Sequence, residues 1–243
     1  MAAFDHALAL GADGLELDVH LARDGVVVVH HDATLERTTN GRGAIASCTA
    51  AQLRELDAGY WFTGPDADGA FPFRNTGVRI PTLASVLSRY PGVPLLIELK
   101  GQDVELARHM VALVRSARAE DRVACGSFSR RLLREVRRAA PEVRTGASHE
   151  ETRWALYRSW AGCPVRRTPY REFQIPERSG RTTIVTPRFV AHAHRAGVAV
   201  KVWTVDEPAD IDRLLDWGVD AIISDRPDVA VPAVAARRRP CQP

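Results

Sequence analysis

The 243-residue sequence predicts an α/β protein built on a parallel sheet, and three observations support that class. From Pro81 onward, short apolar runs alternate with longer segments of helical periodicity, as in consecutive β-α units. Charged residues stand near the ends of several predicted strands, where barrel enzymes place their active sites. No G-x-G-x-x-G loop or P-loop occurs, which weakens a nucleotide-binding doubly wound sheet.

The number of predicted strands favours a (β/α)₈ barrel that lacks one strand, with an open doubly wound sheet as the alternative. Strands are expected at residues 14–19, 95–100, 122–128, 143–147, 173–175, 198–205 and 220–224. Helices are expected at residues 2–10, 82–89, 104–118, 130–140, 150–159, 187–196 and 209–217.

The beginning of the chain predicts a helix followed by a hairpin. The first helix should stop at Gly11, because glycine readily ends helices. The strand at 14–19 and the valine run at 26–29 flank an Asp-Gly turn signal at 24–25. Residues 33–80 then break the rhythm, with helix only near 50–56, and loops of this length are usually functional.

Composition indicates an ordinary globular protein. A net charge of +3 gives no support for nucleic-acid binding, and no apolar run is long enough for a membrane span. The four cysteines form no C-x-x-C pair, so neither a zinc site nor a disulfide framework is expected. No signal peptide opens the chain, and a cytoplasmic location is expected. We expect the basic run at 237–239 to be part of a solvated C-terminal tail at 228–243.

Carboxylates on two predicted strands indicate a site for a hard metal ion. Glu16 and Asp18 are two residues apart on one strand and therefore share a face. Glu98 and Lys100 share a face near the end of another strand. Three carboxylates suit Mg²⁺ or Ca²⁺, which prefer oxygen ligands. The alternative is an amphipathic strand whose acids only face solvent.

Three further residues are candidates for the same site. Histidine suits proton transfer near neutral pH, and one of the adjacent pair His30 and His31 should face the site. Lys100 either holds a phosphate or balances the acids in a salt bridge. Trp203, near the end of its strand, either walls a pocket or belongs to the core.

Several segments, in order along nearly the whole chain, resemble the glycerophosphodiester phosphodiesterase family. They are G-A-D-G-L-E-L-D-V at 11–19, D-G-V-V-V-V-H-H-D at 24–32, L-E-R-T-T-N-G-R-G at 35–43, I-P-T-L at 80–83, L-I-E-L-K at 96–100, S-F at 127–128, V-W-T-V at 202–205 and G-V-D-A-I-I-S-D-R-P at 218–227. Any one is modestly specific, and together they are strong.

The resemblance implies one domain over 1–243, a (β/α)₈ TIM barrel of the phospholipase-C-like phosphodiesterase type. Residues 37–80 would be a segment inserted after the second strand. The implied reaction is hydrolysis of a small-molecule glycerophosphodiester to an alcohol and sn-glycerol 3-phosphate. It also implies a divalent metal on Glu16, Asp18 and Glu98, acid/base work by His31, a phosphate beside Lys100 and a pocket wall at Trp203. It implies nothing about oligomeric state.

The sequence departs from the family pattern at its start. The family opens with a strand ending in His-Arg-Gly and then a Pro-Glu-Asn segment, whereas this sequence begins inside the following helix. We therefore expect an N-terminally truncated member without the first strand and the first catalytic histidine. Either the start is assigned too late, or the chain is a degraded relative.

Two alternative functions remain open from the sequence. One is an inactive or truncated barrel that acts at most as a binding protein. The other is a related phospholipase that acts on choline lipids with the same three carboxylates.

Overall fold

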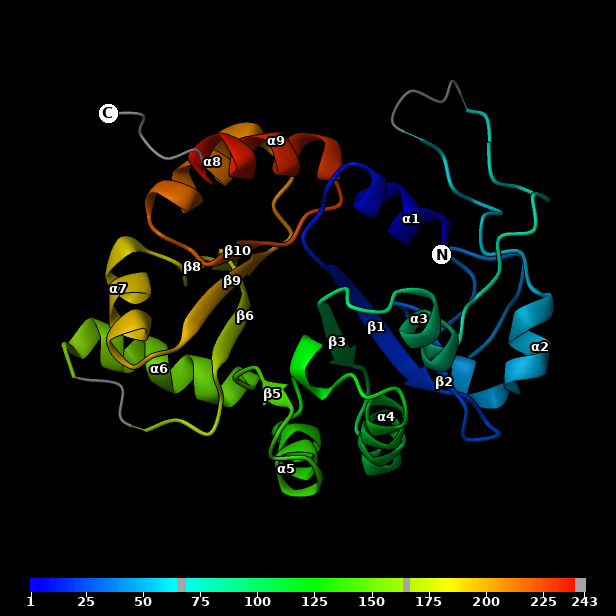
Figure 1. The fold of residues 1–243 in the computed structure, drawn as a ribbon, viewed down its shortest axis with the longest axis horizontal. Helices are drawn as coiled ribbons and strands as arrows, with labels where there is room; N and C mark the ends of the chain where they lie inside the picture. The colour runs from blue at the N-terminus through cyan, green and yellow to red at the C-terminus, as the bar shows by residue number, and fades with distance from the viewer. Residues whose placement is uncertain (65–68, 164–166, 239–243) are drawn as a thin grey trace. The chain divides into compact units, whose positions relative to one another are not determined.

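The computed structural model describes residues 1–64, 69–163 and 167–238, and within them helices alternate with mostly parallel strands (Figure 1). Two compact units are distinguished. The first contains Met1–Asp5 and Leu15–Val143, and the second contains His6–Gly14 and Arg144–Pro243. The chain opens on α1 (Ala2–Ala9), which ends just before Gly11, where a φ of 98° requires a residue without a side chain.

The first unit contains a sheet with the strand order β2-β1-β3-β4. These strands are β1 (Leu15–Leu21), β2 (Val27–Val29), β3 (Leu95–Leu99) and β4 (Val123–Gly126). β1 and β2 form the predicted antiparallel hairpin, and Gly25 in its turn has a φ of 79°. β1, β3 and β4 are parallel.

The register of β1 and β3 decides which side chains share a face. Leu15, Leu17 and Val19 are buried, and the alternate residues of β1 lie on the other face. Asp18 pairs with Glu98 across the two parallel strands. Acidic residues of both strands therefore emerge side by side, at the same level of the sheet.

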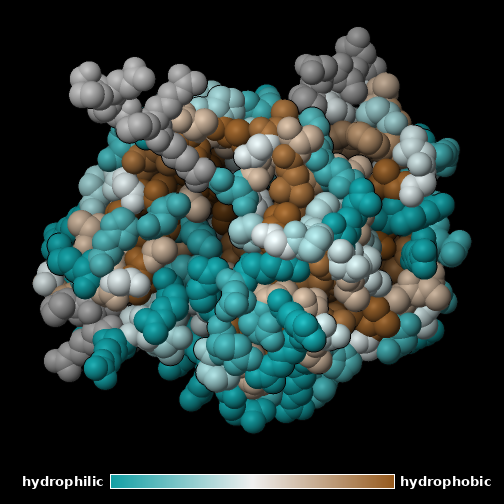
Figure 2. Space-filling model, in the orientation of Figure 1, coloured by the Kyte–Doolittle hydropathy of each residue, from teal (hydrophilic) through white to brown (hydrophobic). Residues whose placement is uncertain are grey.

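Helices of the first unit begin at polar caps and bury one apolar stripe. The helices are α2 (Ala50–Glu55), α3 (Leu83–Arg89), α4 (Val104–Ser116) and α5 (Arg130–Ala139). Thr82, Asp103 and Ser129 each accept a hydrogen bond from a backbone N–H in the first turn of α3, α4 and α5, respectively. The arginine-rich outer face of α5 is strongly hydrophilic, as Figure 2 shows at the lower edge.

The segment predicted as an insertion has little regular structure, as expected. Between 37 and 80 the described residues hold only the 3₁₀ turn η1 (Ile45–Ser47) and α2, and residues 65–68 lie outside the described part. Thr49 and Gln52 form a capping box at the start of α2. This segment and neighbouring residues share a small core of Ala22, Val28, Leu35, Ile45, Leu53 and Ile80.

The second unit contains a parallel sheet with the order β10-β9-β6. The strands of this unit are β5 (Arg144–Thr145), β6 (Glu172–Pro176), β7 (Arg178–Ser179), β8 (Thr182–Thr183), β9 (Ala199–Trp203) and β10 (Ala221–Ile222). Of these, β7 and β8 form a separate antiparallel hairpin. Its helices are α6 (His149–Ala161), α7 (Pro187–Arg195), α8 (Pro208–Asp216) and α9 (Pro227–Arg238). Phe173 and Phe189 are fully buried in its core.

Two local predictions differ from the structure, and one hairpin was not predicted. The tail expected from 228 begins instead as α9, and Arg237 pairs with Asp212 and with Asp216 at 3.0 Å, so this arginine is not merely solvated. The β7–β8 hairpin was not predicted, because its two-residue strands are too short for a periodicity to show. β5 is shorter than the run at 143–147, although Gly146 still bridges to Glu172.

Among the described residues, no helix combines the length and apolar character needed to cross a bilayer.

Candidate active site

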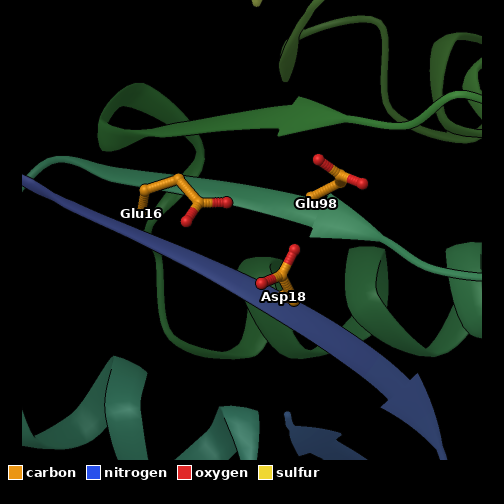
Figure 3. A group of neighbouring side chains, drawn as sticks. All are labelled: Glu16, Asp18 and Glu98. Carbon is orange, nitrogen blue, oxygen red and sulfur yellow. The ribbon is translucent and has the colours of Figure 1, made fainter. Parts of the chain in front are cut away.

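Three carboxylates predicted from the sequence come together in the first unit. Glu16 and Asp18 extend from β1, and Glu98 extends from β3 (Figure 3). One ligand oxygen from each lies within 4.8 Å of the other two. We call these residues the carboxylate cluster. It forms because the i, i+2 spacing on β1 meets the parallel register that sets Glu98 beside Asp18.

Lys100 lies against two members of the carboxylate cluster. Its Nζ donates to Glu98 Oε1 at 2.7 Å and pairs with Asp18 Oδ1 at 2.9 Å. Burial acts to lower the pKa of Lys100, but the bonds to Glu98 and Asp18 outweigh it and raise that pKa. Three carboxylates against one ammonium give these four groups a net charge of −2 when all are ionised.

The chemistry of the cluster fits a hard divalent cation. All three ligating groups are carboxylates, the donor type that Mg²⁺ and Ca²⁺ prefer. The side chains of Asp18 and Glu98 are only 13% and 17% exposed, so solvent screens their charge incompletely. The net negative charge remaining beside Lys100 favours a cation further.

His31 is the accessible histidine of the adjacent pair. Its side chain is 63% exposed, and its Nδ1 lies 2.6 Å from Asp32 Oδ1. Asp32 also accepts from Arg37, at 2.5 Å from Nε and 2.9 Å from Nη2. Hydrogen bonds from Arg37 and then from His31 hold the pKa of Asp32 well below its usual range. Because ionised Asp32 only accepts, Nδ1 of His31 carries a hydrogen, and Nε2 is the atom that remains for proton exchange.

His30 has a structural environment instead. It is buried, with Nδ1 at 2.9 Å from the Asp32 carbonyl and Nε2 at 3.0 Å from Thr38 Oγ1. Both ring nitrogens are thus engaged, and the ring fixes the loop that follows β2.

Sequence reasoning did not select His20 and Arg37. His20 continues the face of Glu16 and Asp18 along β1, and its Nε2 lies 3.1 Å from the His31 carbonyl oxygen. Burial lowers the pKa of His20, which favours the neutral ring. The same two-residue spacing would have found His20, whereas Arg37 has no such signal because a loop brings it to Asp32.

Trp203 belongs to the second unit and lies half-buried at the end of β9. Lys201 precedes it on the same face of the strand and pairs with Glu172 of β6 at 2.9 Å. Glu172 also accepts from Gln174 Nε2 at 2.5 Å. The lysine and glutamate are thus already satisfied by each other and by the amide.

Comparison with known proteins gives one consistent result. The model of the Glycerophosphoryl diester phosphodiesterase family matches residues 1–229. A glycerophosphodiester phosphodiesterase from Caldanaerobacter subterraneus is 33% identical over 95% of this chain and 89% of the relative. One from Bacillus subtilis is 30% identical over 93% of this chain and 78% of the relative.

Solved structures agree with the family match. A phosphodiesterase from Oleispira antarctica, in complex with the product sn-glycerol-3-phosphate, is 27% identical with a TM-score of 0.75, over 96% of this chain and 90% of that one. A glycerophosphodiester phosphodiesterase structure from Agrobacterium tumefaciens is 30% identical with a TM-score of 0.73, over 96% of this chain and 91% of that one. The predicted fold class, an α/β fold of the (β/α)₈ TIM-barrel type, is confirmed.

Proposed function

The chain belongs to the glycerophosphoryl diester phosphodiesterase family, a family of hydrolases, and from this we propose the reaction and the roles of its residues. The proposed reaction is metal-dependent hydrolysis of a glycerophosphodiester to an alcohol and sn-glycerol 3-phosphate. The observation that carries the proposal is the carboxylate cluster, whose oxygens lie within 4.8 Å of one another beside Lys100.

Glu16, Asp18 and Glu98 would hold the cation, Mg²⁺ or Ca²⁺. A divalent ion there would supply Lewis-acid polarisation of the phosphoryl oxygens. The partial burial of Asp18 and Glu98 supports this role, because solvent screens their negative charge incompletely.

Lys100 would hold the phosphate as a positive point charge. Its ammonium is fixed by Glu98 and Asp18, so it cannot swing away into solvent without breaking two charge-assisted bonds. The raised pKa keeps this ammonium protonated throughout the neutral range.

His31 would exchange a proton through Nε2 with an oxygen of the reacting phosphodiester. Asp32 fixes the ring through Nδ1, and Arg37 fixes Asp32 through two bonds. Asp32 and Arg37 are therefore proposed as positioning residues that keep the lone pair of Nε2 directed outward. Trp203 is proposed as a pocket wall from its place in the V-W-T-V segment.

The substrate is proposed to be a small deacylated headgroup diester. Support comes from the relative that holds sn-glycerol-3-phosphate, at 27% identity over 96% of this chain. The aromatic and irregular segment between 37 and 80 is compatible with a pocket for small molecules.

The test is a product assay with glycerophosphocholine and added Mg²⁺ or Ca²⁺. We expect release of choline and sn-glycerol 3-phosphate that stops on chelation of the metal. Asp18→Asn should reduce the rate by about 10³-fold, in the range typical for loss of electrostatic stabilisation.

Two results of this assay would replace the proposal. Hydrolysis of intact phosphatidylcholine without hydrolysis of glycerophosphocholine would indicate a phospholipase. Metal binding without hydrolysis of glycerophosphocholine, glycerophosphoethanolamine or glycerophosphoglycerol would indicate a binding protein.

A further inference from the structure

Helix α6 exposes three large aromatic side chains on its outer side. Trp154 is 65% exposed, Tyr157 is 47% exposed and Trp160 is 52% exposed. Their three-residue spacing aligns them on the helix, and neighbouring ring centroids lie 6.2 Å and 5.7 Å apart. We call these residues the aromatic face. The opposite side of α6 is buried and consists of Thr152, Ala155, Leu156 and Ser159.

Neither the formation of α6 nor its packing requires the residues of the aromatic face. A capping box of Ser148 and Glu151 starts α6, and Gly162 ends it with a φ of 71°. The buried side already anchors α6 against the core of the second unit. Trp and Tyr side chains that remain exposed in one continuous group are typical of a surface that binds a partner.

Arginines surround the aromatic face. Arg153 and Arg158 lie on the same outer side of α6 and are exposed. Arg188 of α7 donates from Nη2 to the Trp160 carbonyl oxygen at 2.9 Å. None of these three forms an ion pair with a carboxylate in the part of the chain that the structure describes.

A further observation places the positive charges together. His192 of α7 is buried, and burial followed by the charges of Arg195, Arg188 and Arg158 lowers its pKa. Arg158 of α6 and Arg188 and Arg195 of α7 are therefore close enough to act on the same imidazole ring. The acidic residues of α6, Glu150 and Glu151, lie in its first turn, at the other end of the helix from Trp160.

We propose that the aromatic face and its arginines bind the surface of an anionic phospholipid bilayer. Trp and Tyr suit the boundary between headgroups and acyl chains, because each combines an apolar ring with a polar atom. Guanidinium groups pair with phosphate oxygens, and the positive charge complements an anionic leaflet. Binding would be peripheral, by one helix lying on the surface. This inference is independent of the proposed hydrolysis.

The experiment is vesicle flotation with the full chain. Vesicles of phosphatidylcholine and phosphatidylglycerol in equal amounts are compared with vesicles of phosphatidylcholine alone. We expect binding to the anionic vesicles, weakened by salt, with a blue shift in tryptophan emission. Trp154→Gln/Trp160→Gln should abolish binding. Arg153→Gln/Arg158→Gln should weaken it about thirtyfold, since each basic residue near such a surface contributes ~1 kcal/mol.

Matched variants in the first unit serve as controls. Phe62→Gln/Phe73→Gln removes two exposed aromatic residues that contact each other, at a ring distance of 5.4 Å. Arg131→Gln/Arg134→Gln removes two exposed charges from α5. Both should bind anionic vesicles as the unmodified chain does, and all variants should keep its circular dichroism spectrum.

Two outcomes would overturn the proposal. One is absence of binding by the unmodified chain, or equal binding by Trp154→Gln/Trp160→Gln. The other is a dimer of the unmodified chain in light scattering that Trp154→Gln/Trp160→Gln abolishes, with no vesicle binding by the unmodified chain or the variant. That result would assign the aromatic face to contact with a second copy of the chain.

Discussion

Each unit of the chain contains a lysine bonded to a carboxylate of the neighbouring parallel strand, but the two groups differ in charge. In the first unit, Lys100 lies among three carboxylates, and the four groups carry −2. In the second unit, the carboxylate that pairs with Lys201 among the described residues is Glu172, which also accepts a hydrogen bond from the neutral amide of Gln174. One group is internally neutral and the other has carboxylate in excess.

Burial follows the same difference. The Glu172 side chain is 4% exposed, whereas those of Asp18 and Glu98 are 13% and 17% exposed. A neutral, satisfied pair tolerates burial, while excess negative charge is stabilised by contact with solvent or with a cation. An acid–lysine contact on adjacent strands therefore does not by itself indicate an ion site, and the surplus of carboxylates is the informative feature.

The largest expected effect concerns the two histidine–aspartate pairs. His31 bonds to Asp32 in the loop after β2, at 2.6 Å, and His194 bonds to Asp220 in the second unit at 2.8 Å. His31→Ala should lower the turnover of glycerophosphocholine by about 10²–10⁴-fold, the usual contribution of a positioned acid/base group. His194→Ala is the matched control and should leave turnover within a factor of two to three. Equal losses in both variants would show that His31 acts only through stability.

The next largest effect is a loss of stability in the second unit. Lys201→Met leaves the Glu172 carboxylate buried with only an amide donor. The free energy of unfolding should fall by about 3 kcal/mol, the low end for breaking a buried ion pair. Urea denaturation with and without Mg²⁺ measures it, and the metal should not restore the loss. Restoration by Mg²⁺ would mean that this pair also forms an ion site.

Lys100→Met should be the contrasting case in the first unit. It removes the ammonium from three carboxylates, so the metal-free chain should lose about 2 kcal/mol, less than Lys201→Met because Asp18 and Glu98 are more exposed. Mg²⁺ or Ca²⁺ at saturation should restore most of this loss through binding to the folded state. A loss of stability that the metal leaves unchanged would show that the excess carboxylate charge does not bind a cation.

The smallest effect is a pH dependence from two histidines, one in each unit, whose pKa is lowered by partial or full burial. Burial lowers the pKa of His20 and of His192. Around and just below pH 6.5 the unfolded chain therefore binds more protons than the folded chain, and stability falls as the pH falls. Denaturation at pH 7.5 and 5.5 should show a smaller loss for His20→Gln and His192→Asn than for the unmodified chain. A larger loss of stability in either variant would contradict the expected direction, in which the histidine binds a proton less readily in the folded chain than in the unfolded chain.

Regular periodicity accounts for what the sequence predicts well. The two-residue spacing of Glu16 and Asp18 and the matching end of β3 predict the carboxylate cluster, since parallel register then fixes the neighbours. The bonds of Asp32 to His31 and Arg37 depend instead on the path of a loop, which has no period. The residues of the helix at 227–238 were expected to form a tail, although Pro227 at the first position is compatible with a helical first turn.

The central claim is that the carboxylate excess in the first unit forms an ion site, which the neutral group in the second unit does not. Calorimetric titration of Mg²⁺ and Ca²⁺ tests it directly, with the unmodified chain, Asp18→Asn and the control Glu172→Gln. We expect saturable binding that Asp18→Asn weakens at least about tenfold, or 1.4 kcal/mol, and that Glu172→Gln preserves. Equal affinity in Asp18→Asn, or loss of binding in Glu172→Gln with the fold intact, would contradict the claim.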